Sequence, residues 1–254
     1  MGADYYNSLS LTTLTYENLQ EVLGKIAQEH NLLATDVQVV SARPLTVEES
    51  IGNPIRQDYP LIKGRETMLE AEVCGAKGQA FTDMPGSFSG SLQEVVEAKI
   101  STNFDRAILI ATLNATLRHL GWIDRTIHCR DEEPEECAKQ LVEYVQDLVA
   151  EPKIAFIGLQ PAMVDHLSKH YSLRVTDLDA ENVGQIKYGV EIEPAEKTAE
   201  IIEWSNIILS TGTTLVNNTF SALLTDNKPV VFYGVTVSGI AFLTGSRQFC
   251  HCGR

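Results

Sequence analysis

The sequence predicts an α/β protein in two parts, an N-terminal α+β domain over residues 1–150 and a C-terminal Rossmann-like domain over residues 151–254. Two observations predict this class. In the first part, short strand patterns joined by glycine-containing turns form a meander and precede helical patterns. From residue 153 onward, short apolar runs alternate with helical patterns, which is typical of a doubly wound parallel sheet.

The first part opens with a predicted amphipathic helix over residues 15–30, where apolar residues recur three and four positions apart. A short strand is expected at residues 36–42. Residues 52–60 carry two prolines and a glycine, which indicates a long irregular connection. Residues 67–74 alternate apolar and polar side chains, and the turn at 75–78 leads into a second strand, so a hairpin is expected here.

Three helices follow the hairpin. Ser91 and Glu94 match a capping box for a helix that begins near residue 92, after a segment expected to be a loop. Residues 104–120 are apolar nearly all round and end at a glycine, which predicts a buried central helix. Pro134, preceded by acidic residues, opens a third helix with one apolar stripe.

The second part contains four apolar strand patterns, and ligands of open parallel sheets bind outside the carboxyl ends of such strands. These ends are Gly158, Asp177, the turn at 210–214, and Gly234. The first glycine lacks the companions of a dinucleotide-binding loop, so dinucleotide binding has weak support. Asp177 stands where an acidic residue that binds a ribose hydroxyl is expected, although a solvated turn aspartate would look the same.

The turn after the third of these strands combines hydroxyls with a glycine. Thr211 ends the strand, Gly212 permits a tight turn, and Thr213 or Thr214 is expected to cap a helix that follows. Backbone amides and the positive end of a helix dipole would then meet in one place, which suits a carboxylate or phosphate. A cap without any ligand is the alternative.

Asn217 and Asn218 strengthen the interpretation of this turn as a site. Asparagine is a poor helix former, and two of them in a first turn suggest side chains that point toward a cleft. Asn114 lies in the middle of the apolar helix and needs hydrogen-bond partners once buried, so it orients a site or joins two elements.

The composition and the net charge limit the kinds of partner that this protein is expected to have. The chain has 254 residues, 44% of them hydrophobic and 21% charged, as in ordinary globular proteins, and it carries a formal net charge of -14. This charge repels phosphate backbones and anionic lipid, so no nucleic acid or membrane partner is expected. Because the sequence shows neither an apolar signal segment nor a long apolar run, a cytoplasmic location is expected. Homo-oligomerisation is left open.

Cysteine and histidine residues offer candidate metal ligands. His128 and Cys129 are adjacent, but their spacing to Cys137 matches no strong zinc pattern, and Cys137 falls on the apolar stripe of the third helix. The other candidate ligands lie in a tail that is expected to be exposed and flexible, and they are Cys250, His251 and Cys252.

A carboxylate on the predicted hairpin is a candidate acid or base. Glu70 and Glu72 share one strand face, and a second domain that covered this face would raise the pKa of one of them. If the face is uncovered, both carboxylates are solvated and have no role.

Four segments of the chain resemble the putative heavy-metal chelation family, a domain of unknown function. The segments are residues 63–92, 105–121, 125–138 and 209–224. The resemblance implies an enolase N-terminal-like domain followed by a Rossmann-like domain. It also implies a cleft between the domains, with candidate residues Glu72, Thr82, Asp83, Asn114, His128 and the turn from Thr211 to Asn218.

The preferred hypothesis is therefore a small-molecule site at the domain interface. The threonine-rich turn would hold an anionic or polar group, Asp177 a hydroxyl, and Glu72 or His128 would transfer protons. The resemblance points to a pterin-, flavin- or chelator-like metabolite undergoing condensation or hydrolysis, linked to heavy-metal chelation or metal-cofactor biosynthesis. One alternative is a non-catalytic protein that binds a heavy metal or a metal chelate, and another is a Rossmann-type methyltransferase or dehydrogenase.

Overall fold

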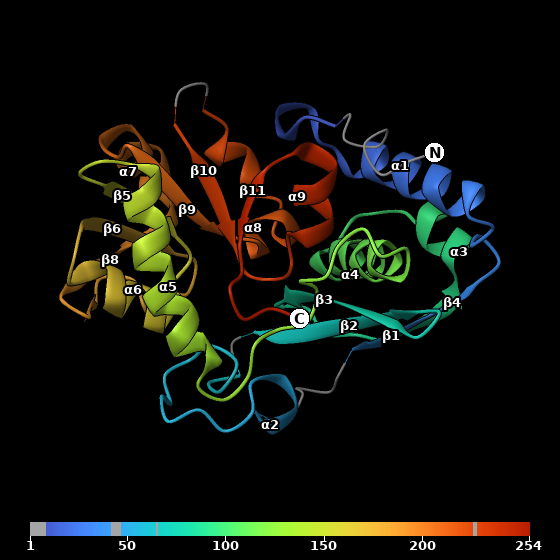
Figure 1. Cartoon of the computed structure of the whole chain (residues 1–254), viewed down its shortest axis with the longest axis horizontal. Coiled ribbons are helices and arrows are strands. Elements are labelled where there is room, and N and C mark those ends of the chain that lie inside the picture. The colour runs from blue at the N-terminus through green and yellow to red at the C-terminus, as the bar shows by residue number, and fades with distance from the viewer. Residues whose placement is uncertain (1–8, 42–46, 65, 226–227) are drawn as a thin grey trace.

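The computed structural model describes residues 9–41, 47–64, 66–225 and 228–254. It contains two sheets that lie side by side, with the C-terminus between them in the view of Figure 1. The first sheet has the strand order β3-β2-β1-β4, and the second has the order β11-β10-β9-β5-β6-β8-β7. The predicted mixed α/β class is confirmed.

The first sheet is antiparallel. Its strands are β1 (Asp36–Ser41), β2 (Thr67–Val73), β3 (Ala76–Thr82) and β4 (Phe88–Ser91). β2 pairs with β1 on one side and with β3 on the other, as the meander predicts. β4 pairs with β1 in a segment expected to be a loop, because a four-residue edge strand has no alternating pattern of its own and is defined by a distant partner. Residue 42, the expected end of β1, lies outside the described residues.

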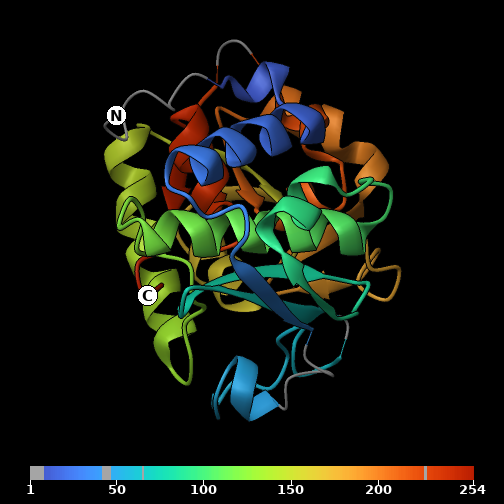
Figure 2. The same cartoon turned by 90° about the vertical axis from the view of Figure 1, so that its right-hand side faces the viewer.

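Helices cover one face of this sheet. They are α1 (Tyr16–Glu29), α3 (Leu92–Glu97) and α4 (Asn103–His119), and the shorter η2 (Leu11–Thr13) and α2 (Val47–Ser50) complete the first part. The predicted capping box of Ser91 and Glu94 is present at the start of α3. α4 is buried along most of its length and packs on β2 and β3, as its apolar sequence predicts (Figure 2).

The second sheet is parallel except at one edge. Its parallel strands are β5 (Lys153–Ile157), β6 (Ser172–Asp177), β8 (Val190–Pro194), β9 (Ile207–Thr211), β10 (Val230–Tyr233) and β11 (Arg247–Phe249). β7 (Ile186–Lys187) pairs with β8 in an antiparallel hairpin. The four predicted strands are confirmed as β5, β6, β9 and β10. β7, β8 and β11 were not predicted, because β7 and β11 are short edge strands and β8, next to β7, is a short strand without a continuous apolar run.

Helices flank the second sheet. They are α5 (Glu133–Leu148), α6 (Pro161–Ser168), η3 (Ala195–Lys197), α7 (Thr198–Trp204), α8 (Thr213–Val216), η4 (Phe220–Leu223) and α9 (Ser238–Thr244). The prediction of a single continuous helix after β9 is wrong. α8 lasts four residues and η4 follows separately, because Asn218 adopts a left-handed backbone with φ of 57° between them.

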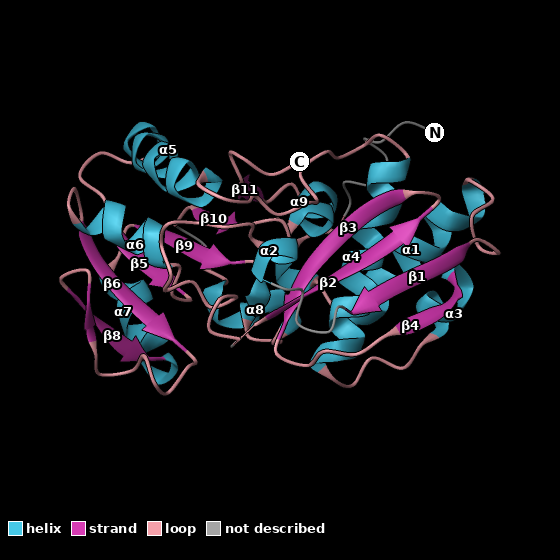
Figure 3. Ribbon diagram, turned by 90° about the horizontal axis from the view of Figure 1, so that it is seen from below, coloured by secondary structure: helices cyan, strands magenta, loops and turns pink. Residues whose placement is uncertain are grey.

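The two parts share hydrophobic packing. Ala155 and Ile157 of β5 belong to the same apolar cluster as α4, α8 and α9, whereas Ile154 and Phe156 face α5 and α6. Figure 3 shows α8 and α9 lying between the two sheets. A boundary at residues 150–151 stays a prediction, and α5, which precedes it, packs on α6. No helix in the described ranges is long and apolar enough to cross a bilayer.

Candidate functional site

A cavity of about 670 Å³ lies where the two parts of the chain meet. The second sheet contributes the carboxyl ends of β5, β6, β9 and β10, through Gly158, Asp177, Thr211 and Gly234. Phe81 and Asp83, at the end of β3, line it from the first part. The strand ends that the sequence singles out therefore meet in one hollow, as expected for an open parallel sheet.

The backbone conformation at the end of β5 and the close approach of Thr211 both require a glycine at position 158. Its φ is 85°, and a Cβ added there would stand 2.6 Å from Cγ2 of Thr211. The hydroxyl of Tyr233 donates to the carbonyl of Gly158 over 2.6 Å, which joins β5 to β10 beneath the cavity. Burial, with Asp177 and Glu66 nearby, raises the pKa of Tyr233 well above its usual range, so this hydroxyl remains a donor.

The threonine-rich turn lines the cavity, but its geometry differs from the expected cap. Gly212 is the N-cap residue, and Thr213 and Thr214 are the first residues of α8, so the assignment of either threonine as the cap is wrong. Instead the hydroxyl of Thr211 accepts from the N–H of Thr213 over 3.2 Å, and the hydroxyl of Thr214 donates to the Thr211 carbonyl over 2.8 Å. A helix of four residues supplies little dipole, which weakens the argument for an anion here.

Asp177 is fixed by neutral donors. One of its oxygens accepts from the N–H of Leu159 over 2.6 Å, and the other accepts from the N–H of Asp179 over 2.7 Å and from the side-chain amide of Asn182 over 3.2 Å. These bonds hold the carboxylate at the edge of the cavity. They also connect β6 to the start of the segment that leads into α6.

Asp83 faces the same cavity from the first part of the chain. Its carboxylate accepts a hydrogen bond of 2.7 Å from Asn103, the first residue of α4. Asn103 also donates to the side chain of Asn217, which lines the cavity just after α8. Asp83 and Asn217, both expected at the cleft, are thus connected through one amide.

Glu66 is a cavity residue that the sequence analysis did not single out. It lies one position before β2, and burial together with the charges of Asp177 and Asp83 raises its pKa to about 7. A single glutamate before a strand resembles any solvated glutamate. Only the approach of two other carboxyl groups, from residues far along the chain, distinguishes it.

His128 lies beside Phe81 on the wall of the cavity, where the two rings meet edge to face with centroids 5.2 Å apart. The backbone N–H of His128 donates to the side chain of Gln79 over 2.7 Å, which fixes the segment to β3. Burial lowers the pKa of His128 to about 4. The imidazole is therefore neutral at pH 7 and is available as a proton acceptor rather than a proton donor.

Four cysteines gather at one end of the cavity. Cys129, Cys137 and Cys250 line it, and Cys252 lies next to Cys137. Burial raises the pKa of all four thiols, to about 12 for Cys250 and about 11 for Cys252. All are free thiols.

The prediction that the C-terminal tail is exposed and flexible is wrong. Cys250 is 4% exposed, because the last residues pair with the segment before α5: Thr126 donates to the carbonyl of Arg254 over 2.9 Å, and Arg254 donates to that of Ile127 over 3.0 Å. His251 is exposed and does not line the cavity.

The donor groups do not form a ready site for a metal ion. Within the described ranges, no three Cys, His, Asp or Glu side chains are placed where they could hold one. The clustered thiols are also protonated at neutral pH, whereas thiolate is the form that binds metals. The described residues as they stand therefore do not form a preassembled metal site, and a metal would have to displace the thiol protons.

Several predicted residues lie outside the cavity. Glu72 is exposed on β2, and its neighbour Glu70 pairs with Lys77 over 2.6 Å and accepts from Gln79 over 2.7 Å. Thr82 is buried and accepts from the N–H of Met84 over 3.1 Å, which closes the turn after β3.

Two further residues of the predicted cleft have structural partners instead. Asn114 is fully buried and hydrogen-bonded to backbone groups of β3, of the segment before α9, and of α9 itself. Asn218 accepts a hydrogen bond of 3.2 Å from the hydroxyl of Tyr16 in α1. Gly212 shapes the turn without lining the cavity.

Comparisons with known proteins agree with the resemblance in the sequence. The family model described as putative heavy-metal chelation matches residues 140–247. No curated protein matches the chain.

Two solved structures from this family have a similar fold. One is a protein of unknown function from Pyrococcus horikoshii, with a TM-score of 0.54 and 17% identity over 87% of this chain and 78% of that one. The other is a protein of unknown function from Desulfitobacterium hafniense DCB-2, with a TM-score of 0.50 and 15% identity over 70% of this chain and 73% of that one. Similarity at this level of identity concerns the fold alone.

Proposed function

We propose that this protein binds a small organic metabolite in the cavity and acts on it by proton transfer. Its residues 140–247 match the putative heavy-metal chelation family. The observation that carries the proposal is the position of Glu66. This carboxyl group faces Asp177 and Asp83 inside the cavity, and its pKa is about 7. Enzymes commonly separate the pKa values of neighbouring carboxyl groups so that one of them exchanges protons at neutral pH.

In this proposal, Glu66 takes the role that the sequence analysis gave to Glu72. A carboxyl group with a pKa near the working pH both donates and accepts a proton, which condensation and hydrolysis each require. His128 is neutral at pH 7, because burial lowers its pKa, so it is a second group that accepts a proton. The hydroxyls of Thr211 and Thr213 provide hydrogen bonds to polar parts of the metabolite.

The walls of the cavity suit a flat or hydrophobic molecule. Tyr59, Phe81, Leu159 and Met163 line it together with the polar groups. A cavity with mostly apolar walls and a few convergent polar groups is typical of metabolite sites. The family description connects this metabolite to heavy-metal chelation, so a pterin-, flavin- or chelator-like compound is the proposed ligand class.

Native mass spectrometry of freshly purified protein tests the proposal directly. We expect a stoichiometric organic ligand, or a raised melting temperature with at least one member of a pterin, flavin and chelator panel. Glu66→Gln should reduce turnover of an identified substrate by at least about 100-fold, whereas Glu191→Gln, an exposed residue of β8, should not. Absence of a bound ligand together with no response to the panel would count against the proposal.

A second candidate is a non-catalytic protein that binds a metal or a metal chelate. The convergence of Cys129, Cys137, Cys250 and Cys252 favours it, although their geometry does not yet form a metal site. Elemental analysis of protein prepared without an affinity tag separates the candidates. Stoichiometric metal that is lost in Cys250→Ser would support the second candidate, and loss in Cys74→Ser, a distant exposed thiol, would indicate surface binding only.

A further inference from the structure

We propose that this cavity binds a nucleoside, a ribose joined to a flat base, that carries no phosphate group. The nucleoside lies at the carboxyl ends of β5, β6 and β8, where Asp177 accepts a hydrogen bond from a ribose hydroxyl. This inference rests on the proposed function for the use of the cavity as a metabolite site, and it specifies the ligand.

The first argument is the order of the strands. The six parallel strands, numbered in chain order as β5, β6, β8, β9, β10 and β11, have the spatial order 3-2-1-4-5-6. The order reverses between β5 and β9, and the residues at their carboxyl ends, Gly158 and Thr211, both line the cavity. Open sheets of this order typically bind ligands that contain nucleosides in the crevice at this reversal.

The second argument is the position of Asp177, the last residue of the second strand, β6. An acidic residue here binds a ribose hydroxyl in folds of this strand order. Among the described residues, one Asp177 oxygen accepts only from the N–H of Leu159, whereas the other accepts from the N–H of Asp179 and from Asn182. A carboxylate oxygen accepts about two hydrogen bonds, so the first oxygen keeps a position for a ribose hydroxyl.

The third argument concerns the base. Leu178 follows Asp177, lines the cavity, and is 62% exposed. Ala195 and Thr198, which follow the third strand, β8, line the cavity too, and the hydroxyls of Thr198 and Thr176 lie 3.4 Å apart. A flat base between these strand ends would cover the apolar side chain of Leu178, and the burial of that surface would favour binding.

The fourth argument concerns the place where a phosphate group would bind. In dinucleotide-binding folds of this order, free backbone amides between the first strand and the first helix hold the pyrophosphate. Here the N–H of Gly158 donates to the carbonyl of Thr176 over 2.8 Å, and the N–H of Leu159 donates to Asp177. Pro161, the first residue of α6, has no N–H. Most of this connection therefore offers no amide to a phosphate.

The charges of the cavity also disfavour a phosphate. The described residues that line it include neither a lysine nor an arginine. His128 adds no positive charge at pH 7, because burial lowers its pKa to about 4. A phosphate would meet repulsion from the carboxylate of Asp177 and from Glu66 when it is ionised. The ligand is therefore a nucleoside rather than a nucleotide, and the dinucleotide of a dehydrogenase is disfavoured.

The test compares three forms of each nucleoside on the full chain. Adenosine, guanosine, cytidine and uridine are each paired with the 2′,3′-dideoxynucleoside, which lacks the ribose diol, and with the 5′-monophosphate. Binding is followed by protein NMR, with the amides of Gly158, Leu159 and Asp179 reporting on the cavity. We expect at least one ribonucleoside to shift these amides and to bind at least about tenfold more tightly than both of its analogues.

Two results of this comparison would overturn the inference. Equal binding of the ribonucleoside and the dideoxynucleoside would show that no ribose hydroxyl is recognised. Tighter binding of the monophosphate would show that the cavity accepts a phosphate. Because the comparison uses the unchanged protein, it decides the inference even if a variant of Asp177 fails to fold.

Variants show whether the cavity residues are responsible. Asp177→Asn should weaken ribonucleoside binding at least about tenfold, whereas Asp147→Asn, the same change at an exposed position of α5, should alter it less than about twofold. Leu178→Ser should weaken binding about fivefold. Ile186→Ser, at an exposed position of β7 that does not line the cavity, should alter it less than about twofold. Equal effects within each pair would contradict the proposed position of the nucleoside.

The outcomes also distinguish this inference from the proposed function. If no ribonucleoside shifts the three amides but a member of the pterin, flavin and chelator panel does, the nucleoside inference fails and the metabolite site stands. If a ribonucleoside binds as expected and the panel has no effect, the inference holds and the pterin, flavin or chelator class fails. If neither set shifts these amides at millimolar concentration, both proposals fail.

Discussion

The side-chain oxygen of Asn114 accepts a hydrogen bond of 2.7 Å from the backbone N–H of Gly239. Asn114 lies in α4 of the first part, and Gly239 lies in α9 of the second. The amide of the same side chain donates to the carbonyls of Gln79, Val235 and Thr236. One fully buried asparagine therefore joins the two parts of the chain beside the cavity.

Asn114→Ala should destabilise the protein by about 3 kcal/mol, because it leaves several buried backbone groups without a partner. Urea denaturation measures the change in the free energy of unfolding. Gln146→Ala, at an exposed position on α5, is the matched control and should cost less than about 0.5 kcal/mol. Equal losses in the two variants would show that the Asn114 bonds contribute little.

Glu66 should make stability depend on pH. Burial and the neighbouring carboxylates raise its pKa from 4.5 to about 7, so the folded state favours the protonated acid. Below pH 4.5 the carboxyl group of Glu66 is protonated in both the folded and the unfolded state, so it does not change the free energy of unfolding. As the pH rises from 4.5 to 7 the unfolded state ionises while the folded state stays protonated, so the folded state loses about 2 kcal/mol of relative stability, and this loss levels off above pH 7, where both states are ionised.

Glu66→Gln removes this ionisable group, so the variant should be more stable than the parent protein by about 2 kcal/mol at pH 8 and nearly equal to it at pH 4.5. Denaturation at the two pH values measures the difference. Glu191→Gln should show no such pH dependence. A stability gain of the same size at both pH values would mean that the pKa of Glu66 is not raised.

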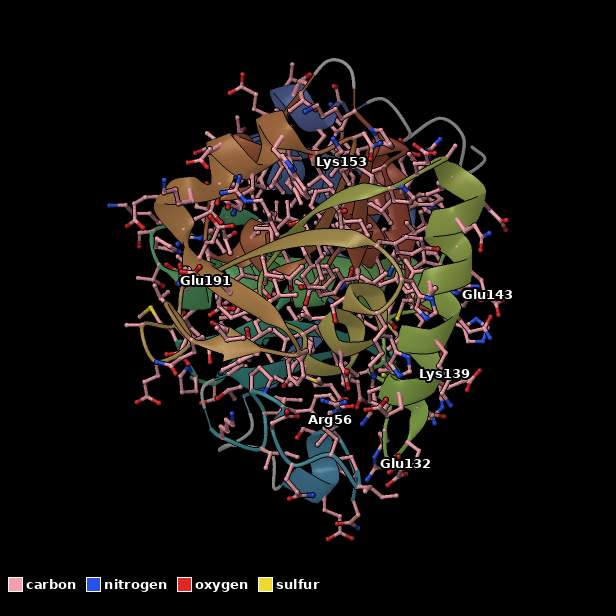
Figure 4. All side chains as sticks on the ribbon, turned by 90° about the vertical axis from the view of Figure 1, so that its left-hand side faces the viewer. Arg56, Glu132, Lys139, Glu143, Lys153 and Glu191 are labelled. Carbon is pink, nitrogen blue, oxygen red and sulfur yellow. The ribbon has the colours of Figure 1, made fainter. Side chains whose placement is uncertain are left out.

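Arg56 fixes the irregular segment that supplies Tyr59 to the cavity. Its guanidinium group contacts Glu135 of α5 and Asp165 of α6 over 2.5 Å each, and Asp58 over 3.4 Å. Figure 4 shows Arg56 beside the lower end of α5, with Lys139 and Glu143 labelled along the helix and Glu132 labelled just before its start.

Arg56→Ala should cost about 3 kcal/mol, because three partly buried carboxylates lose their counter-charge. Limited proteolysis should also detect faster cleavage within residues 52–64. Lys139→Ala is the control, since Lys139 forms a surface pair with Glu136 over 3.6 Å, and it should cost less than about 0.5 kcal/mol. Similar cleavage rates in both variants would contradict a fixing role for Arg56.

The cysteines should differ in reactivity. Cys74 is exposed in the turn between β2 and β3, whereas Cys129, Cys137 and Cys250 are buried and have raised pKa values. A disulfide reagent such as Ellman's should therefore modify Cys74 at least about 100-fold faster than the buried thiols, which become reactive on unfolding. Cys74→Ser should remove the fast phase alone. A fast phase that persists in this variant would mean that the cysteine cluster is open to solvent.

Local patterns in the sequence determined much of the second sheet and the central helix. The apolar runs of β5, β6, β9 and β10 and the all-round apolar surface of α4 are properties of short stretches, so they are visible without coordinates. The same patterns located Gly158 and Asp177, because chain direction alone determines which end of a parallel strand carries the ligand site.

The tertiary structure decided which side chains face one another. Edge strands β4 and β11 exist through pairing with partners distant along the chain, and the last residues become fixed only because they pair with residues 126–127. Glu66 becomes unusual only when Asp177 and Asp83 approach it in the fold. A pKa and a cavity depend on distances between remote residues, and sequence periodicity reports only on the faces of single elements.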